Sequence, residues 1–428
     1  MSIMSMLVAG GGFTPLSLFS GGVQGVWYDP SDLSTMFEDS AGTTAVHTPG
    51  NGTADSPVGK ILDKSGNGNH ATQSTSTKRP TLSAKYNLLT YTEDFSNAAW
   101  SKIGQTNGIT PVVTANAGTD PLGGNTATRV VFSRTTATSA DRSYLQQTAT
   151  GTGSTNYTLS CWVKSATGTD QQLSIYGNFG VGGARVWITA TSTWQLFTCS
   201  ETSSAGGTSL PYAIGFFADT TSGLTSDVLI WGAQIKATND GVGLPAYQRV
   251  VDANTYDSVG FPYYLKSDGV DDAMQSSAVA INNFALVIGG AKIGTAASGY
   301  PFFEQGPNVN ANNGFFVYGS TLSSFYINKG GSTVFYDISA NWWGNPNAVV
   351  TAYYDLTNAV VRKNTSQLAT SAYTASLTVT DNFNLFSRNQ TSVYANMRMY
   401  GLILCGTNLT AGQLANTESW MNGKTKAY

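Results

Sequence analysis

The stretch that most resembles a chemical motif is DKSGNGNHATQ, residues 63–73, in which Gly66, Gly68 and Ala71 match G-x-G-x-x-A. That spacing is typical of a dinucleotide-binding turn, whose glycines let a pyrophosphate approach the N-terminus of the next helix. The segment that follows, TQSTSTKRPTLS, is rich in Thr and Ser, carries Pro80 and has no apolar helical stripe. We therefore interpret the stretch as a tight turn whose glycines accept positive φ, and we predict no nucleotide cofactor.

Residues for catalysis are scarce. The only histidines are His47 and His70, both in loop-like sequence, and no G-x-S-x-G occurs, so a serine hydrolase would lack its base. Glycoside hydrolysis needs two carboxylates about 5 to 10 Å apart, and no sequence pattern pairs any two of the acids here. We expect these acids to cap turns and predict no catalytic residue and no enzyme. The acids considered are Asp29, Asp32, Glu38, Asp39, Asp63, Asp268, Asp271 and Asp272.

Oxygen-bearing side chains in two turns raise the question of calcium. Asp63, Asn67, Asp268, Asp271 and Asp272 are ligands of the type that calcium uses, but EF-hand spacing is absent. Asp and Asn in turns also hydrogen-bond their own backbone without an ion. We predict no metal site and no cofactor, with structural calcium as the open alternative.

Sugar recognition would use exposed aromatic rings. Trp342 and Trp343, in SANWWGNPNAV, are the candidate glycan-binding residues, because neighbours on a strand face opposite ways and one of them should leave the core. The alternative is a tryptophan at a subunit contact or loop edge. Trp100 and Trp231 are expected in the core.

The composition excludes several classes of protein. Charged residues make up 11% of the 428 residues and the formal net charge is −3, so no basic field exists to hold nucleic acid. Cys161, Cys199 and Cys405 show no metal-binding spacing and are expected to be buried free thiols. The N-terminus is apolar but has no 18-residue apolar run, which argues against membrane insertion. It is interpreted as an extended arm covered by a partner chain.

The remaining chain alternates with a period of two. In YTLSCWVKS, residues 157–165, Tyr157, Leu159, Cys161 and Val163 share one face, and GFFVYG, VVTAYYDL, NMRMYGLILCG and DVLIWGAQIKA are similar short runs. Such runs predict an all-β protein built of antiparallel β-sandwiches. One short helix is expected near the C-terminus, where Thr410 and Gln413 form a capping box and Asn422-Gly423 would end it.

Two sets of sequence segments resemble known protein families. GVWYDPSDLSTMFEDSAGTTAV, LDKSGNGNHATQ, LKSDGVDDAM and MYGLILCG...LTAGQLANTESWMNGKT resemble the laminin-G-like or concanavalin-A-like lectin jelly roll of bacteriophage structural proteins. Between them, NLLTYTEDFSNAAWSK, YTLSCWVKS, WQLFTCS and VLIWGAQIKA...LPAYQRV resemble a carbohydrate-binding-module-like jelly roll common in phage tail and fibre proteins.

The resemblance implies two antiparallel sandwiches, one inserted in the other. The expected domains are an N-terminal anchoring arm (1–24), a split lectin-like sandwich (25–85 and 251–428) and an inserted jelly roll (86–250). Lys60 to Asp63 and Tyr264 to Lys266 are expected to form strands of one sandwich.

The function implied is that of a structural component on the surface of a phage virion: a capsid decoration protein, head fibre or tail fibre. Its partners would be capsid or tail proteins, bound through the arm, and two further copies in a homotrimer. Fold alone does not select a ligand, so a host-glycan adhesin is the alternative and an extracellular glycan-degrading enzyme the third.

Overall fold

The protein is described from a computed structural model. The described residues are 12–428 except 181, 219–222, 239, 294–299, 307–313, 320–323, 330–331, 338–346 and 374–378. For residues 300–301, 314–319, 324–329, 332–337 and 379 the description is limited to the backbone.

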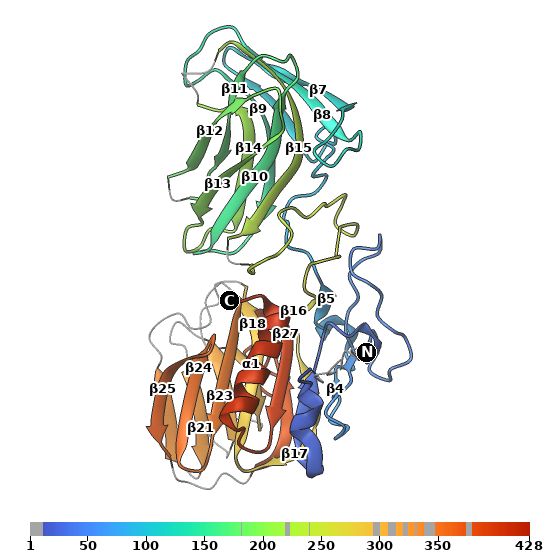
Figure 1. Ribbon diagram of the computed structural model, residues 1–428, viewed down its shortest axis with the longest axis vertical. Coiled ribbons are helices and arrows are strands. Elements are labelled where there is room, and N and C mark those ends of the chain that lie inside the picture. Colours follow the sequence, from blue (N-terminus) through green and yellow to red (C-terminus); the bar gives the residue numbers. More distant parts are fainter. Residues whose placement is uncertain are drawn as a thin grey trace, which may run out of the picture.

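The chain is nearly all β, as the period-two pattern predicts. Four antiparallel sheets form two face-to-face pairs, which are the two bodies seen in Figure 1. Within the described residues the single α-helix is α1 (Ala411–Thr425), near the C-terminus. No helix in this part of the chain is long and apolar enough to cross a membrane.

The first sheet has eight strands in the order β25-β24-β23-β18-β27-β16-β5, with β1 also paired to β27. Its strands are β1 (Gly25–Tyr28), β5 (Thr81–Ser83), β16 (Tyr264–Asp268), β18 (Phe284–Lys292), β23 (Ala348–Tyr354), β24 (Asn358–Lys363), β25 (Ser366–Ala372) and β27 (Asn396–Cys405).

The second sheet has nine strands in the order β2-β3-β4-β17-β26-β19-β20-β21-β22. They are β2 (Met36–Phe37), β3 (Lys60–Ile61), β4 (Ala71–Thr72), β17 (Met274–Ile281), β19 (Tyr300–Gln305), β20 (Gly314–Gly319), β21 (Ser324–Lys329), β22 (Ser332–Asp337) and β26 (Val379–Leu385).

Strands from the two ends of the chain lie side by side in these sheets. β1 pairs with β27 (Val26 opposite Leu404), β5 pairs with β16, and β4 pairs with β17. Ile61 and Leu265, from the two segments expected to share a sandwich, are fully buried in one hydrophobic core. We call this body the split sandwich. The exact domain limits predicted between residues 85 and 86 and between residues 250 and 251 stay a prediction.

The other two sheets come from one uninterrupted stretch, which we call the continuous sandwich. One has the order β13-β10-β15-β8-β7 and the other β12-β11-β14-β9-β6. Their strands are β6 (Ser101–Gln105), β7 (Gly108–Gly118), β8 (Ala127–Arg134), β9 (Arg142–Thr150), β10 (Asn156–Ser165), β11 (Gln171–Gly177), β12 (Ala184–Ala190), β13 (Gln195–Thr202), β14 (Ser209–Phe216) and β15 (Thr225–Ala237).

Alternation along β10 works as predicted. Tyr157, Leu159, Cys161 and Val163 all point into the core between the two sheets. Trp100 and Trp231 are also buried, with 1% and 3% of their surface exposed, so neither is available to a ligand.

The N-terminal segment corrects one prediction. Part of the expected extended arm, residues Pro15–Gly22, forms a 3₁₀ helix, η1, instead. Leu18 and Phe19 are buried against the outer face of the first sheet, together with Met421 of α1, so the chain itself covers these apolar side chains. Residues 1–11 of the arm lie outside the described residues.

Helix α1 begins as predicted and ends slightly later. The Thr410 hydroxyl accepts from the backbone N–H of Gln413, whose side chain returns the bond in a capping box. The helix runs through Asn422-Gly423 to Thr425, and Lys426 takes a left-handed conformation there. Two short 3₁₀ turns, η2 (Leu33–Thr35) and η3 (Ser76–Lys78), complete the elements.

The glycine-rich stretch is a turn, as expected. Gly66 and Gly68 have φ of 90° and 76°, and the chain continues into β4 rather than a long helix. The Asp63 carboxylate accepts hydrogen bonds from the backbone N–H groups of Trp27, Ser65 and Asn69. The stretch therefore holds β1 in place, and its polar side chains are used in the fold.

Candidate functional site

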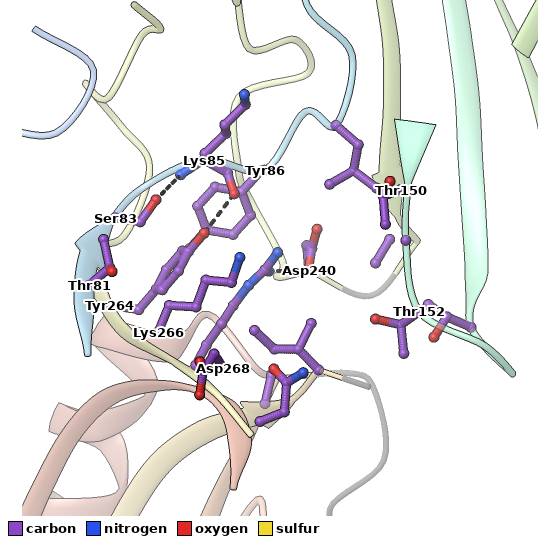
Figure 2. A pocket seen from close by; sticks show the side chains of 18 of the residues that line it. Thr81, Ser83, Lys85, Tyr86, Thr150, Thr152, Asp240, Tyr264, Lys266 and Asp268 are labelled. Carbon is purple, nitrogen blue, oxygen red and sulfur yellow. Dashed lines mark hydrogen bonds and ion pairs between the residues drawn. The ribbon is translucent and has the colours of Figure 1, made fainter. Parts of the chain in front are cut away.

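A cleft of about 500 Å³ lies where the two sandwiches meet (Figure 2). Its volume falls within the range of about 300 to 1,000 Å³ typical of small-molecule sites. Both bodies and both connecting segments contribute walls. The lining residues with polar side chains are Asp55, Thr81, Ser83, Lys85, Tyr86, Thr150, Thr152, Thr155, Tyr157, Asp240, Tyr264, Lys266, Asp268, Asp272, Asn396 and Arg398.

A buried ion pair joins the two bodies at this cleft. Arg398, on β27, donates from Nη1 to Oδ1 of Asp240, which follows β15, over 2.6 Å. The guanidinium also lies over the rings of Tyr86 and Tyr264, 5.0 and 4.9 Å from their centroids. Burial raises the pKa of Asp240, and the charge of Arg398 opposes that shift.

The ion pair leaves hydrogen-bonding capacity unused. Asp240 and Arg398 are 7% and 9% exposed, and among the described residues Asp240 Oδ2 and Arg398 Nε have no hydrogen-bond partner. Both atoms are buried beneath the cleft surface, so the pair shapes the floor of the cleft, and the ligand-accessible groups are those of the walls.

The connecting segments are tied by a second polar centre, Gln248. Its Oε1 accepts from the backbone N–H groups of Tyr86 and Asn87, at 2.7 and 2.9 Å. Its Nε2 donates to the carbonyls of Ala84 and Asp257, at 2.8 and 2.7 Å. Three of these bonds join the two connecting segments and the fourth, to Asp257, braces the second segment, so the sandwiches meet at a rigid junction.

Further bonds hold the second crossing against the split sandwich. Asn347 Nδ2 donates to the carbonyls of Asp240 and Thr425, while its Oδ1 accepts from the Tyr400 hydroxyl. The backbone N–H of Val242 donates to the carbonyl of Lys426 over 2.6 Å. The cleft is thus preformed.

Two lysines stand on one wall, and Figure 2 shows Thr150 and Thr152 on the other. Burial lowers the pKa of Lys85. Lys266 is exposed within the cleft, but the protein around it removes part of its hydration and, with the charge of Arg398, lowers its pKa.

The acidic turn between β16 and β17 borders the same cleft. Carboxylate oxygens of Asp268, Asp271 and Asp272 lie within 4.8 Å of one another. Burial, and then the charge of Asp268, raises the pKa of Asp272 to about 7. Asp272 Oδ2 accepts from the N–H of Asp268, and Asp268 Oδ1 accepts from that of Val270, so the acids also cap their own turn.

The other predicted residues that the structure describes do not line this cleft. Trp342 and Trp343 lie outside the described residues. Asp63 and Asn67 bind backbone groups around β1, so the five oxygen ligands considered for calcium do not form one site. His70 accepts from the N–H of Asp63 through Nδ1. The three cysteines are buried free thiols, as predicted.

Sequence reasoning missed the residues that build the junction. Asp240, Gln248 and Arg398 stand in segments that resemble ordinary loop or strand, and no motif or spacing connects them. Arg398 does offer one weak signal, because a charge interrupts the apolar run NMRMYGLILC.

No protein-family model matches the chain, and no curated protein matches it. Among solved structures, it resembles the botulinum neurotoxin type G receptor binding domain with 12% identity and a TM-score of 0.30. That match covers 38% of this chain and 43% of the neurotoxin domain, so the chain spans less than half of it.

Two further structures give similar values. The Ruminococcus gnavus IT-sialidase CBM40 bound to α2,3-sialyllactose matches with 14% identity and a TM-score of 0.27, covering 34% of this chain and 97% of that one. The binding domain of Paraclostridial Mosquitocidal Protein 1 matches with 10% identity and a TM-score of 0.31, covering 43% and 51%. Similarity this remote carries no assignment of function.

Proposed function

We propose that the protein is a non-enzymatic adhesin that holds a neutral, hydroxyl-rich ligand of the carbohydrate class in the junction cleft. One observation carries the proposal. The preformed cleft between the two sandwiches has walls that combine uncharged hydroxyl groups with charged side chains of both signs. A sugar hydroxyl both donates and accepts, so it can bond to a threonine or serine hydroxyl, a lysine or a carboxylate of these walls.

The charges around the cleft support a neutral ligand. Lys85, Lys266 and Arg398 are balanced by the carboxyl groups of Asp55, Asp240, Asp268 and Asp272, one of which has a pKa of about 7. Phosphates or multiply charged ligands would meet this mixed field without net attraction. The hydroxyls of Thr150 and Ser83 add uncharged hydrogen-bonding groups to the walls.

We infer binding without turnover because the acidic pair nearest the cleft already has backbone partners. Asp268 and Asp272 are close enough to suggest glycoside hydrolysis, but both carboxylates accept from N–H groups of their own turn. We expect no reducing ends to be released from a polysaccharide panel, and steady release would contradict the proposal.

A glycan array with the full chain tests the proposal, followed by calorimetry on any neutral oligosaccharide that binds. Lys266→Ala and Thr150→Val remove polar groups from opposite walls, and each should weaken binding about fivefold to tenfold. Lys164→Ala, on the other end of β10 and away from the cleft, is the matched control. Binding that is unaffected by both cleft variants would refute the site.

Attachment to a phage particle is the second candidate function. The sequence resemblance suggests it, and the rigid junction built on Gln248 suits a projecting two-body spike. In this proposal residues 1–11 anchor the chain to capsid or tail proteins, and three copies assemble at the attachment point.

Deletion of residues 1–11 tests the anchor, because it keeps Leu18 and Phe19 in their core. Folding should be unchanged and incorporation into purified particles should be lost, as measured by immunoblot. Normal incorporation of the truncated chain would eliminate the anchor, and sedimentation of the full chain as a monomer would eliminate the trimer.

A further inference from the structure

A second surface feature lies on the sheet ordered β12-β11-β14-β9-β6, at the opposite end of β9 from the cleft residue Thr150. Ile175 and Ile188 of this sheet point into the core, so alternation places Tyr176 and Trp187 on its outer face. Tyr176 stands opposite Arg185 in the register of β11 and β12. With Phe217, just after β14, and Arg142, at the start of β9, these side chains form one continuous row that we call the stacked face.

The stacked face alternates aromatic rings and guanidinium groups. Arg185 lies 5.0 Å from the ring centroid of Trp187 and 5.1 Å from that of Tyr176. Phe217 stacks on Tyr176 with centroids 4.3 Å apart and an interplanar angle of 18°. Arg142 lies 4.5 Å over Phe217. Each guanidinium is therefore oriented by rings rather than by a counter-ion.

Neither arginine forms an ion pair with any residue in the described part of the chain. Arg185 donates from Nη1 to the carbonyl of Ala218, and its buried Nε has no partner among the described residues. Asp141, next to Arg142, accepts from Thr136 and Thr138 instead. Within the described residues these two positive charges therefore have no acidic partner, on a protein whose formal net charge is −3.

The exposed indole beside Arg185 identifies the ligand chemistry. Trp187 is 48% exposed on β12, an edge strand of its sheet. A flat apolar ring next to a planar cation matches a pyranose that carries an acidic substituent. The ring face stacks on the indole, and the acid accepts hydrogen bonds from Nη1 and Nη2 of the guanidinium.

We propose that the stacked face binds an acidic polysaccharide, with one acidic sugar at Trp187 and Arg185 and a neighbouring one at Arg142. This site is separate from the junction cleft and does not rest on the function proposed for it. Carboxylate-bearing and sulfate-bearing chains share the chemistry, and the experiment distinguishes them. Unpaired single-stranded nucleic acid also stacks on aromatic rings and is treated as a competing outcome.

Affinity electrophoresis of the full chain tests the proposal, with gels containing polygalacturonate, dextran sulfate or neutral dextran. The first two should retard the protein and neutral dextran should not. Retardation by one acidic polymer alone identifies uronate or sulfate as the preferred acid. Because charge contributes, retardation should fall as salt rises from low to physiological concentration.

Three variants locate the binding. Arg185→Gln and Trp187→Ala should each weaken affinity about tenfold, and Arg185→Lys should recover only part of it, since an ammonium cannot pair with an acid in a fork. Arg129→Gln is the matched control, because Arg129 is an exposed arginine of the other sheet that already pairs with Asp227. Circular dichroism verifies that each variant is folded.

The proposal is overturned if folded Arg185→Gln and Trp187→Ala bind like the unmodified protein, if neutral dextran retards it equally, or if a single-stranded oligonucleotide binds more tightly than either acidic polymer. Lys266→Ala should leave acidic binding unchanged. The electrophoresis result for the stacked face is therefore independent of the glycan-array result for the cleft.

Discussion

Arg398 and Arg185 make the same contacts with aromatic rings but occupy opposite environments. Each guanidinium lies about 5 Å from two ring centroids, 5.0 and 4.9 Å for Arg398 and 5.1 and 5.0 Å for Arg185. Arg398 is buried and paired with Asp240, whereas Arg185 is half-buried and has no acidic partner in the described chain. In both places the aromatic rings orient the guanidinium. Burial and an acidic partner then decide whether the arginine stabilises the fold or is available to a ligand.

The largest expected effect follows removal of the buried charge. Arg398→Gln leaves Asp240 buried without its partner, which should cost about 3 to 5 kcal/mol of unfolding free energy. Denaturant titration measures it. The double variant Asp240→Asn with Arg398→Gln should lose less than the sum of the single losses, since neither charge is then left alone. A loss below about 1 kcal/mol in the single variant would show that the pair is not what joins the bodies.

Loss of Gln248, the neutral polar centre of the junction, should have the second-largest effect on the unfolding free energy. Gln248→Ala leaves the backbone N–H groups of Tyr86 and Asn87 and two carbonyls without their partner, at a cost of at least about 2 kcal/mol. The same titration gives the value, and limited proteolysis should find new cleavage in the connections near residues 84–88 and 238–262. Gln172→Ala, an exposed glutamine on β11, serves as control and should change little.

The acidic turn, unlike the arginines, should make the unfolding free energy depend on pH. Burial raises the pKa of Asp272 to about 7, so its folded pKa lies above its unfolded value and the protonated form stabilises the fold. That stabilisation is complete below about pH 4 and is lost as pH rises through 7.

Asp272→Asn should remove this dependence and make the protein more stable than the unmodified chain at pH 8, by on the order of 1 kcal/mol. Unfolding free energies measured from pH 4.5 to 8 test this, with Asp170→Asn, at an exposed position just before β11, as the control. A parallel slope in the variant and the unmodified chain would contradict the assignment.

The smallest effect on stability should come from the stacked face itself. Arg185→Gln removes a stacked cation without stranding a buried carboxylate, so the unfolding free energy should change by less than about 1 kcal/mol. Thermal unfolding measures the change. A loss as large as that of Arg398→Gln would mean that the stacked row is a structural cover rather than a binding surface.

The local chemistry of the chain could be predicted well from its residues. The alternation at Tyr157 to Val163, the capping box at Thr410, and the left-handed glycines Gly66 and Gly68 depend on neighbours within a few residues. The arm at Pro15–Gly22 was predicted wrongly as extended, because what covers Leu18 and Phe19 is Met421, some 400 residues away.

The sequence by itself therefore determined the all-β class, the strand faces, the closing helix and the absence of a nucleotide turn, since these follow from short-range periodicity and turn chemistry. Only the tertiary structure decided the two surfaces for which binding is proposed. Asp240 meets Arg398 across 158 positions, and Phe217, just after β14, meets Tyr176 of β11 and Arg142 of β9. Whether a charge is paired or free depends on which segments pack together in space, and no local pattern records that.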